Sequence, residues 1–135
     1  MQRAAGGAPS AVRLRTWARA ACAGPAEITL RVVGAAEARR LNRAFRSRDY
    51  ATNVLSFPYG ARPLRGDIVL CHPVIAREAR QQGKSLAAHY AHLVVHGMLH
   101  LRGHGHSRKP AAARMERAEI RILRRLGFGD PYIVE

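Results

Sequence analysis

The segment HGMLHLRGHGH, residues 96–106, carries histidines at a spacing that could bind a metal ion. His96 and His100 are four residues apart, so on a helix their rings would lie one turn apart on the same face. Gly103 can end that helix with a positive φ angle, and the chain could then fold back to bring His106 to the same ion. Because three imidazoles leave one coordination position open, the pattern predicts a catalytic site for one Zn²⁺ ion, which would lower the pKa of a bound water to about 7.

The same spacing, HxxxHxxGxxH, occurs in zinc proteases of the metzincin type. Gly97, however, occupies the position at which HExxH enzymes keep the glutamate that activates water, so a protease would need a base elsewhere in the chain. Cleavage of a phosphodiester places different demands on a site. Negative charge develops on the phosphate oxygens in its transition state, and a divalent ion and arginine side chains can stabilise this charge. The motif therefore favours phosphodiester cleavage. Nickel, cobalt, copper and iron accept the same ligands as zinc.

The charge of the chain also favours a polyanionic partner. Its 23 Lys and Arg residues outnumber 9 Asp and Glu residues, which gives a formal net charge of +14. Only Lys84 and Lys109 are lysines, so a coding bias toward arginine is an alternative source of part of this excess. The apolar runs are too short for a membrane span, and residues 1–12 lack the apolar stretch of a secretory signal. The isolated Cys22 and Cys71 are typical of a cytoplasmic protein.

The pattern of apolar, capping and turn residues predicts alternating helices and strands. Helices are expected at residues 10–22, 35–45, 73–82, 86–102 and 110–126, and strands at 27–33, 53–57 and 67–71, with a loop over YGARPLRG between the last two strands. This order predicts an α+β fold of one domain, with a small mixed sheet of three to four strands covered by about five helices. We expect residues 10–135 to form the domain and residues 1–9 to be a variable or frayed N-terminus.

From Trp17 onward the chain resembles the YbeY family of bacterial endoribonucleases, which act in ribosomal RNA maturation and ribosome quality control. The family motif HGxLHLxGxDH appears here as HGMLHLRGHGH. The other matching segments are LNRAFRSRDYATNVLSFPY, GDIVLC, AHLVVHG and LGFGDPYI. The resemblance implies that His96, His100 and His106 bind the metal and that Arg46, in the segment FRSRD, contacts RNA phosphate.

The resemblance also implies the partners and the reaction. The expected substrate is single-stranded RNA, in particular ribosomal RNA. The resemblance leaves open whether ribosome-associated proteins take part. Gly105 replaces the aspartate that usually precedes the third histidine. An aspartate there could orient a ligand or carry a proton, so its absence leaves the orientation of the ligands and the catalytic rate open, whereas metal binding is expected to survive. The alternative function is that of an RNA-binding or ribosome-binding factor in which a three-histidine metal site is structural.

Overall fold

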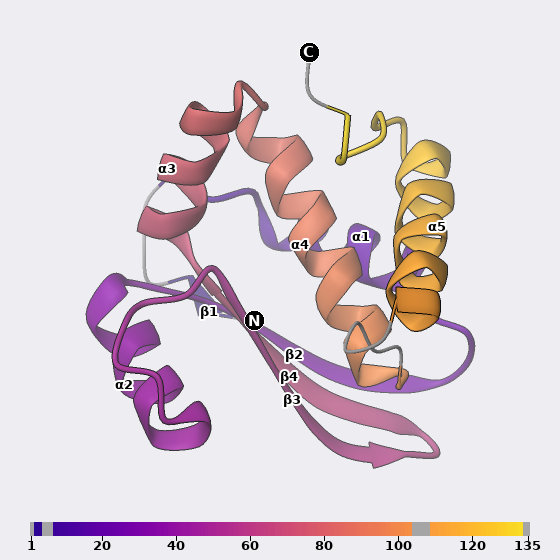
Figure 1. Ribbon diagram of the computed structural model, residues 1–135. Coiled ribbons are helices and arrows are strands. Elements are labelled where there is room, and N and C mark those ends of the chain that lie inside the picture. Colours follow the sequence, from indigo (N-terminus) through magenta and orange to yellow (C-terminus); the bar gives the residue numbers. More distant parts are fainter. Residues whose placement is uncertain (1, 4–6, 104–108, 134–135) are drawn as a thin grey trace.

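A four-stranded mixed sheet forms the centre of the molecule, and helices pack on both of its faces (Figure 1). The computed structural model describes residues 2–3, 7–103 and 109–133. The strands are β1 (Gln2–Arg3), β2 (Ala26–Val33), β3 (Val54–Ala61) and β4 (Leu64–Cys71). The helices are α1 (Ala11–Ala20), α2 (Ala35–Arg46), α3 (His72–Gln82), α4 (Leu86–Leu101) and α5 (Lys109–Arg125). The predicted α+β fold, with its small mixed sheet and about five helices, is confirmed.

The strands lie in the order β1-β2-β4-β3. Strands β1 and β4 are both parallel to β2, whereas β3 is antiparallel to β4 and lies at an edge. The N-terminal edge strand β1 has only two residues, Gln2 and Arg3.

The segment YGARPLRG, residues 59–66, does not form the predicted loop. Strands β3 and β4 continue through most of it, and their pairing extends to Ala61 and Leu64. Proline and glycine are tolerated here because β3 is an edge strand, and the pairing shifts in register between Pro58 and Gly60. The proline and glycine residues that predicted a loop therefore belong to an irregular hairpin.

Both faces of the central strand β4 are buried, as its apolar run requires. Ile68 and Leu70 belong to the larger core, which α1, α4 and α5 share with the sheet. Val69 and Cys71 point to the opposite face and pack with Ala38 of α2. Helix α2 is therefore separated by the sheet from α4, and a site at the sheet edge can receive side chains from both.

Helix α4 crosses one face of the sheet and packs against α1, α3, α5, β3 and β4 (Figure 1). The hydroxyl of Ser85 accepts a hydrogen bond from the backbone N–H of Ala88 at 3.0 Å and so begins the helix. Helix α5 ends at Arg125, and Gly127 follows with a φ of 92°, as the sequence predicts for a residue that ends a helix. None of the described helices is long and apolar enough to cross a membrane.

Candidate metal and RNA site

A polar cavity of about 310 Å³ lies between α4, β3 and the end of α2. It is lined by Arg46, Thr52, Asn53, Val54, Leu55, Ser56, His96 and His100. A larger cavity, of about 610 Å³, lies beside the β3–β4 turn, but its lining contains no histidine or carboxylate. The smaller cavity is therefore the candidate functional site, since it contains the residue types that could carry out the chemistry.

The imidazoles of His96 and His100 lie edge to face in this cavity, with ring centroids 5.0 Å apart. They belong to a row of four histidines on α4, which continues through His92 to His89 with centroid separations of 6.2 and 6.4 Å. The predicted pairing of His96 and His100 on one helix face is therefore what the structure shows. His106, the predicted third ligand, lies outside the described residues.

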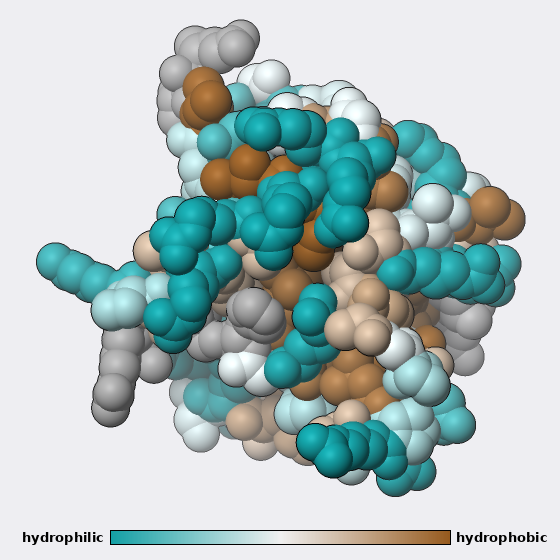
Figure 2. Space-filling model, turned by 90° about the vertical axis from the view of Figure 1, so that its right-hand side faces the viewer, coloured by the Kyte–Doolittle hydropathy of each residue, from teal (hydrophilic) through white to brown (hydrophobic). Residues whose placement is uncertain are grey.

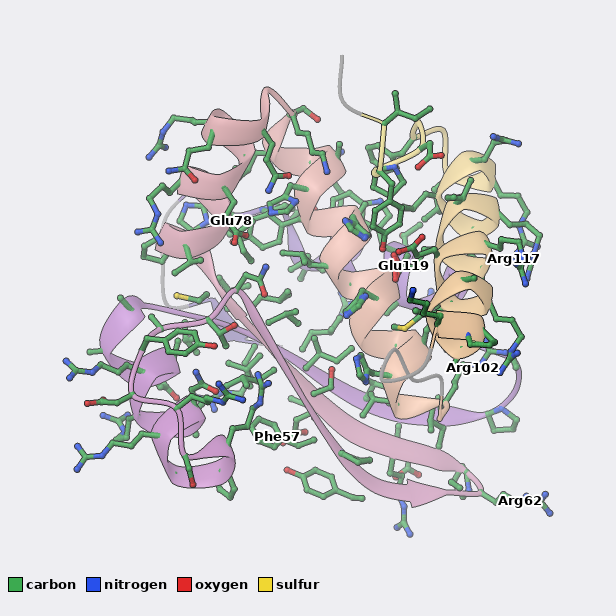
Figure 3. The ribbon with its side chains drawn as sticks, in the orientation of Figure 1. Phe57, Arg62, Glu78, Arg102, Arg117 and Glu119 are labelled. Carbon is green, nitrogen blue, oxygen red and sulfur yellow. The ribbon has the colours of Figure 1, made fainter. Side chains whose placement is uncertain are left out.

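A buried carboxylate orients His96. Glu119 of α5 is fully buried and points toward α4 (Figure 3). One of its oxygens, Oε1, lies 2.7 Å from Nδ1 of His96, and the other, Oε2, lies 2.8 Å from Nε2 of His92. The hydroxyl of Tyr132 also donates a hydrogen bond to Oε2. Because this bond engages Nδ1 of His96, the nitrogen that a metal would take is Nε2.

These hydrogen bonds also determine the charge of Glu119. Burial alone would raise the pKa of its carboxyl group, but the hydrogen bonds from His92, His96 and Tyr132 outweigh burial and lower the pKa to about 2. Burial and the neighbouring Glu119 carboxylate raise the pKa of Tyr132, so its hydroxyl keeps the proton that it donates. The group is thus a carboxylate surrounded by three donors.

His92, His96 and Glu119 could themselves hold a metal ion, since one ligand atom from each lies within 4.8 Å of the others. Two ligands of a tetrahedral zinc ion, each about 2.1 Å from it, would be about 3.4 Å apart. The contacts of 2.7 and 2.8 Å at Glu119 are shorter than this and have the length of charge-assisted hydrogen bonds. The geometry fits a carboxylate that supports His96 better than one that shares an ion with it.

Gly97 permits α4 to lie close to the sheet at the cavity. A Cβ atom at this position would lie 3.2 Å from both Cδ1 of Ile68 and Oγ of Ser56. The Ser56 hydroxyl is 3.4 Å from the carbonyl oxygen of Gly97. A glutamate at position 97 would have no room, so the close packing of helix and sheet accounts for the glycine in the motif.

A second carboxylate supports the other side of the cavity. Glu78 of α3 accepts hydrogen bonds on Oε1 from the side-chain amide of Asn53 at 3.0 Å and from Nε2 of His89 at 2.9 Å. Asn53 lines the cavity, whereas His89 is almost fully buried behind it. Burial lowers the pKa of His89, although the hydrogen bond to Glu78 opposes this. Glu78 thus links a cavity residue to the row of histidines.

Arg46, the last residue of α2, is exposed and lines the cavity. Asp49, three residues further along the chain, is a carboxylate that could pair with this charge. The structure instead pairs Asp49 with Arg39, through contacts of 2.7 and 3.1 Å. Arg46 is therefore placed where it can meet an anion that enters the cavity.

Comparison with known proteins decides the family. Residues 11–127 match the family model described as Endoribonuclease YbeY. The chain belongs to the YbeY family. It is 56% identical over 125 residues to the endoribonuclease YbeY of Aromatoleum aromaticum, a match that covers 92% of this chain and 81% of the relative. It is also 56% identical over 117 residues to that of Methylibium petroleiphilum, covering 86% and 78%.

A solved structure shares the fold of this YbeY-family chain. The solution structure of TM1509 from Thermotoga maritima superposes with a TM-score of 0.61 and covers 98% of this chain and 97% of its own. The two sequences are 21% identical, so the likeness concerns the fold alone.

The YbeY resemblance predicted Arg46, His96 and His100 as site residues, and the structure brings all three to one cavity. Sequence reasoning missed Glu119, Glu78 and Tyr132. A signal for Glu119 was present, because it is a charged residue beside the apolar stripe of α5 that contains Met115, Ala118 and Ile122. Tyr132 gave no such signal, since its contact depends on how the chain returns after α5.

Proposed function

We propose that this chain is a zinc-dependent endoribonuclease that cuts single-stranded RNA, and that its substrate is ribosomal RNA in maturation and quality control of the ribosome. The observation that carries the proposal is the cavity that Arg46, His96 and His100 line together. The names of the relatives support the reaction, and the net charge of +14 supports an RNA substrate.

We assign one metal ion to His96, His100 and His106. The donor set suits zinc, because it consists of imidazoles and because His96 is held by a buried carboxylate, as metal-binding histidines commonly are. When bound, the ion would supply Lewis-acid chemistry, which acidifies water and neutralises charge on phosphate oxygens. The chain itself contributes the orientation of the histidines through Glu119 and Tyr132.

Arg46 would hold the phosphate beside the histidines, since a guanidinium presents paired N–H donors to two phosphate oxygens. Thr52, Asn53 and Ser56 line the same cavity and can hydrogen-bond ribose or phosphate. The cavity volume is at the lower end of the roughly 300–1,000 Å³ that ligand sites span. A volume of this size suits one unstacked nucleotide, which favours single-stranded RNA over a duplex.

Two nucleophiles are compatible with this arrangement, namely water and the ribose 2′-hydroxyl. The ends of the products distinguish them, because attack by the 2′-hydroxyl leaves a cyclic phosphate and attack by water does not.

Cys22 and Cys71 form no disulfide in the structure, which supports a reducing cytoplasm as the location.

The test is cleavage of a single-stranded RNA by the protein loaded with stoichiometric zinc. His100→Ala and Arg46→Ala should each lower the rate at least about 100-fold, the scale of a lost electrostatic contact in a transition state. Arg48→Ala is the matched control, because Arg48 is an exposed arginine near Arg46 that does not line the cavity. Intact RNA with both the wild type and His100→Ala would refute the enzymatic function. If a chelator then unfolded this inactive protein, the metal would be structural.

A further inference from the structure

The outer face of α5 carries a cluster of arginines that the cavity does not use. Arg114, Arg117, Arg121, Arg124 and Arg125 are all exposed. At 3.6 residues per turn, these five positions fall within about 100° of the helix circumference. Figure 2 shows the side of the molecule where α5 lies, on which hydrophilic side chains gather over hydrophobic ones. We call these five residues the α5 arginine face.

Within the part of the chain that the structure describes, no ion pair neutralises this face. The ion pairs of other arginines join Arg31 to Glu37 and Arg39 to Asp49. Glu119 of α5 points to the opposite side, where His92 and His96 bind it. Arginines spaced three and four residues apart on a helix repel each other, so the face is destabilised without an anion. A polyanion is therefore the partner that its charge fits.

The face also has the shape of a binding surface. A shallow hollow of about 480 Å³ is lined by Arg117, Ile120, Arg121, Arg124 and Arg125. The half-buried Ile120 gives the hollow an apolar floor, and guanidinium groups surround it. Ribose and base can pack on such a floor while the guanidiniums contact phosphates on either side.

The α5 arginine face is separate from the cavity. The inner side of α5 packs on α4, and Figure 3 shows Arg117 on the side turned away from α4. Packed helices lie about 8–10 Å apart and each is about 10–12 Å wide, so the face lies roughly 15 Å from the α4 axis. A stacked strand that rises about 3.4 Å per nucleotide spans this distance in about five nucleotides. A stacked trinucleotide in the cavity spans only about 10 Å and would fall short of the face.

We propose that the α5 arginine face is a second RNA-binding surface, which holds the phosphate backbone of a strand several nucleotides from the cavity. The inference rests on the proposed function, because it assumes that RNA occupies the cavity. The face would add affinity for long RNA without selecting a sequence, since phosphate contacts carry no base information.

The test compares two triple variants with the wild type. Arg117→Ala/Arg121→Ala/Arg124→Ala removes the centre of the face, and Arg15→Ala/Arg77→Ala/Arg80→Ala removes three exposed arginines on α1 and α3. The net charge falls by the same amount in both. Binding to a 20-nucleotide single-stranded RNA is measured over a range of KCl concentrations, and cleavage is measured on that RNA and on a trinucleotide.

The face variant should bind the long RNA at least about 10-fold more weakly, and the slope of log K against log [KCl] should fall in magnitude by about 2, from three lost contacts at about 0.7 each. Its cleavage of the trinucleotide should equal that of the wild type, and the control triple variant should retain most of the long-RNA affinity. Equal losses in the two triple variants, or no loss in either, would overturn the proposal. Failure of the wild type to cut either RNA would instead refute the proposed function, and the binding data would still test the face.

Discussion

Two carboxylates, Glu119 and Glu78, bind three of the four histidines of α4. Glu78 accepts a hydrogen bond from His89, and Glu119 accepts hydrogen bonds from His92 and from His96, one of the proposed ligands. Support of this kind fixes which ring nitrogen carries the proton and how the ring is turned. The precision of the site at the residue scale thus depends on side chains that lie outside the histidine motif.

Replacement of Glu119 should weaken metal binding. In Glu119→Gln the amide keeps its shape but can no longer accept hydrogen bonds on both sides, so His96 loses part of its orientation. We expect the dissociation constant for zinc to rise about 10-fold or more, as measured by competition with a chromogenic chelator. Glu116→Gln is the control, because Glu116 is exposed on the same helix. Equal zinc affinity in all three proteins would contradict the role of Glu119.

The buried His89 should make the protein less stable in mild acid. Burial lowers its pKa below the ordinary value of 6.5, against the opposing effect of Glu78, while Lys84 and His92 lower it further. Its Nδ1 is buried and has no hydrogen-bond partner among the described residues, so an added proton there would be unpaired. The unfolded chain takes up this proton near pH 6.5 and the folded chain only at lower pH. Stability from His89 is therefore full above pH 6.5 and declines as the pH falls below it.

The variant His89→Gln tests this, because glutamine can still donate a hydrogen bond to Glu78 but does not titrate. Between pH 7 and pH 5 the wild type should lose more free energy of unfolding than the variant does, as measured by urea denaturation. Parallel losses in the two proteins would show that other groups cause the acid sensitivity.

At the scale of elements, the helix order and most strand positions followed from apolar periodicity and capping residues. Ser85 and Gly127, for example, mark a helix start and end in the sequence and in the structure. The extent of the β3–β4 hairpin was missed because proline and glycine are local signals of a loop, whereas the edge position of β3 and a register shift allow the pairing to continue past Pro58. The contacts of Glu119 and Tyr132 depend instead on how separate elements pack, so no local pattern could predict them. His96 and His100 could be predicted because both lie within one turn of one helix.

The close approach of α4 to the sheet should make position 97 intolerant of a glutamate. In Gly97→Glu the side chain would meet Ile68 and Ser56 within a packed layer, and a carboxylate would be buried there. We expect a loss of at least about 3 kcal/mol in the free energy of unfolding, or insoluble protein. Ala88→Glu, at a half-buried position in the first turn of the same helix, should cost less than about 1 kcal/mol. Denaturation midpoints of the two variants decide this, and similar values would contradict the packing argument.

At the scale of the whole molecule, positive charge works against compactness. Because 23 residues are basic and only 9 are acidic, the net interaction among the charges of the chain is repulsive. The exposed arginines of α5 add a local excess of positive charge. Salt screens repulsion between exposed charges, since the Debye length falls from about 30 Å at 0.01 M to about 8 Å at 0.15 M. RNA would screen the same charges, so binding and folding should be coupled.

The RNA-free protein should therefore become more stable as KCl is raised from 10 to 150 mM. We expect a gain on the order of 1 kcal/mol, which for a chain of this size is a few degrees in Tm. The control triple variant lacking Arg15, Arg77 and Arg80 should gain less, because it carries less charge. A Tm that falls with KCl, or that does not change, would show that repulsion does not limit stability.

The place of Tyr132 in the chain has a consequence for how the site matures during translation. The ribosome makes the four histidines of α4 first, then Glu119, and only afterwards the tyrosine that completes the set of donors around that carboxylate. A nascent chain that stops after α5 would carry the histidines but would lack the third hydrogen bond. The set of hydrogen bonds around Glu119 is thus complete only after synthesis has passed Tyr132, and the support that this carboxylate gives to His92 and His96 is complete no earlier.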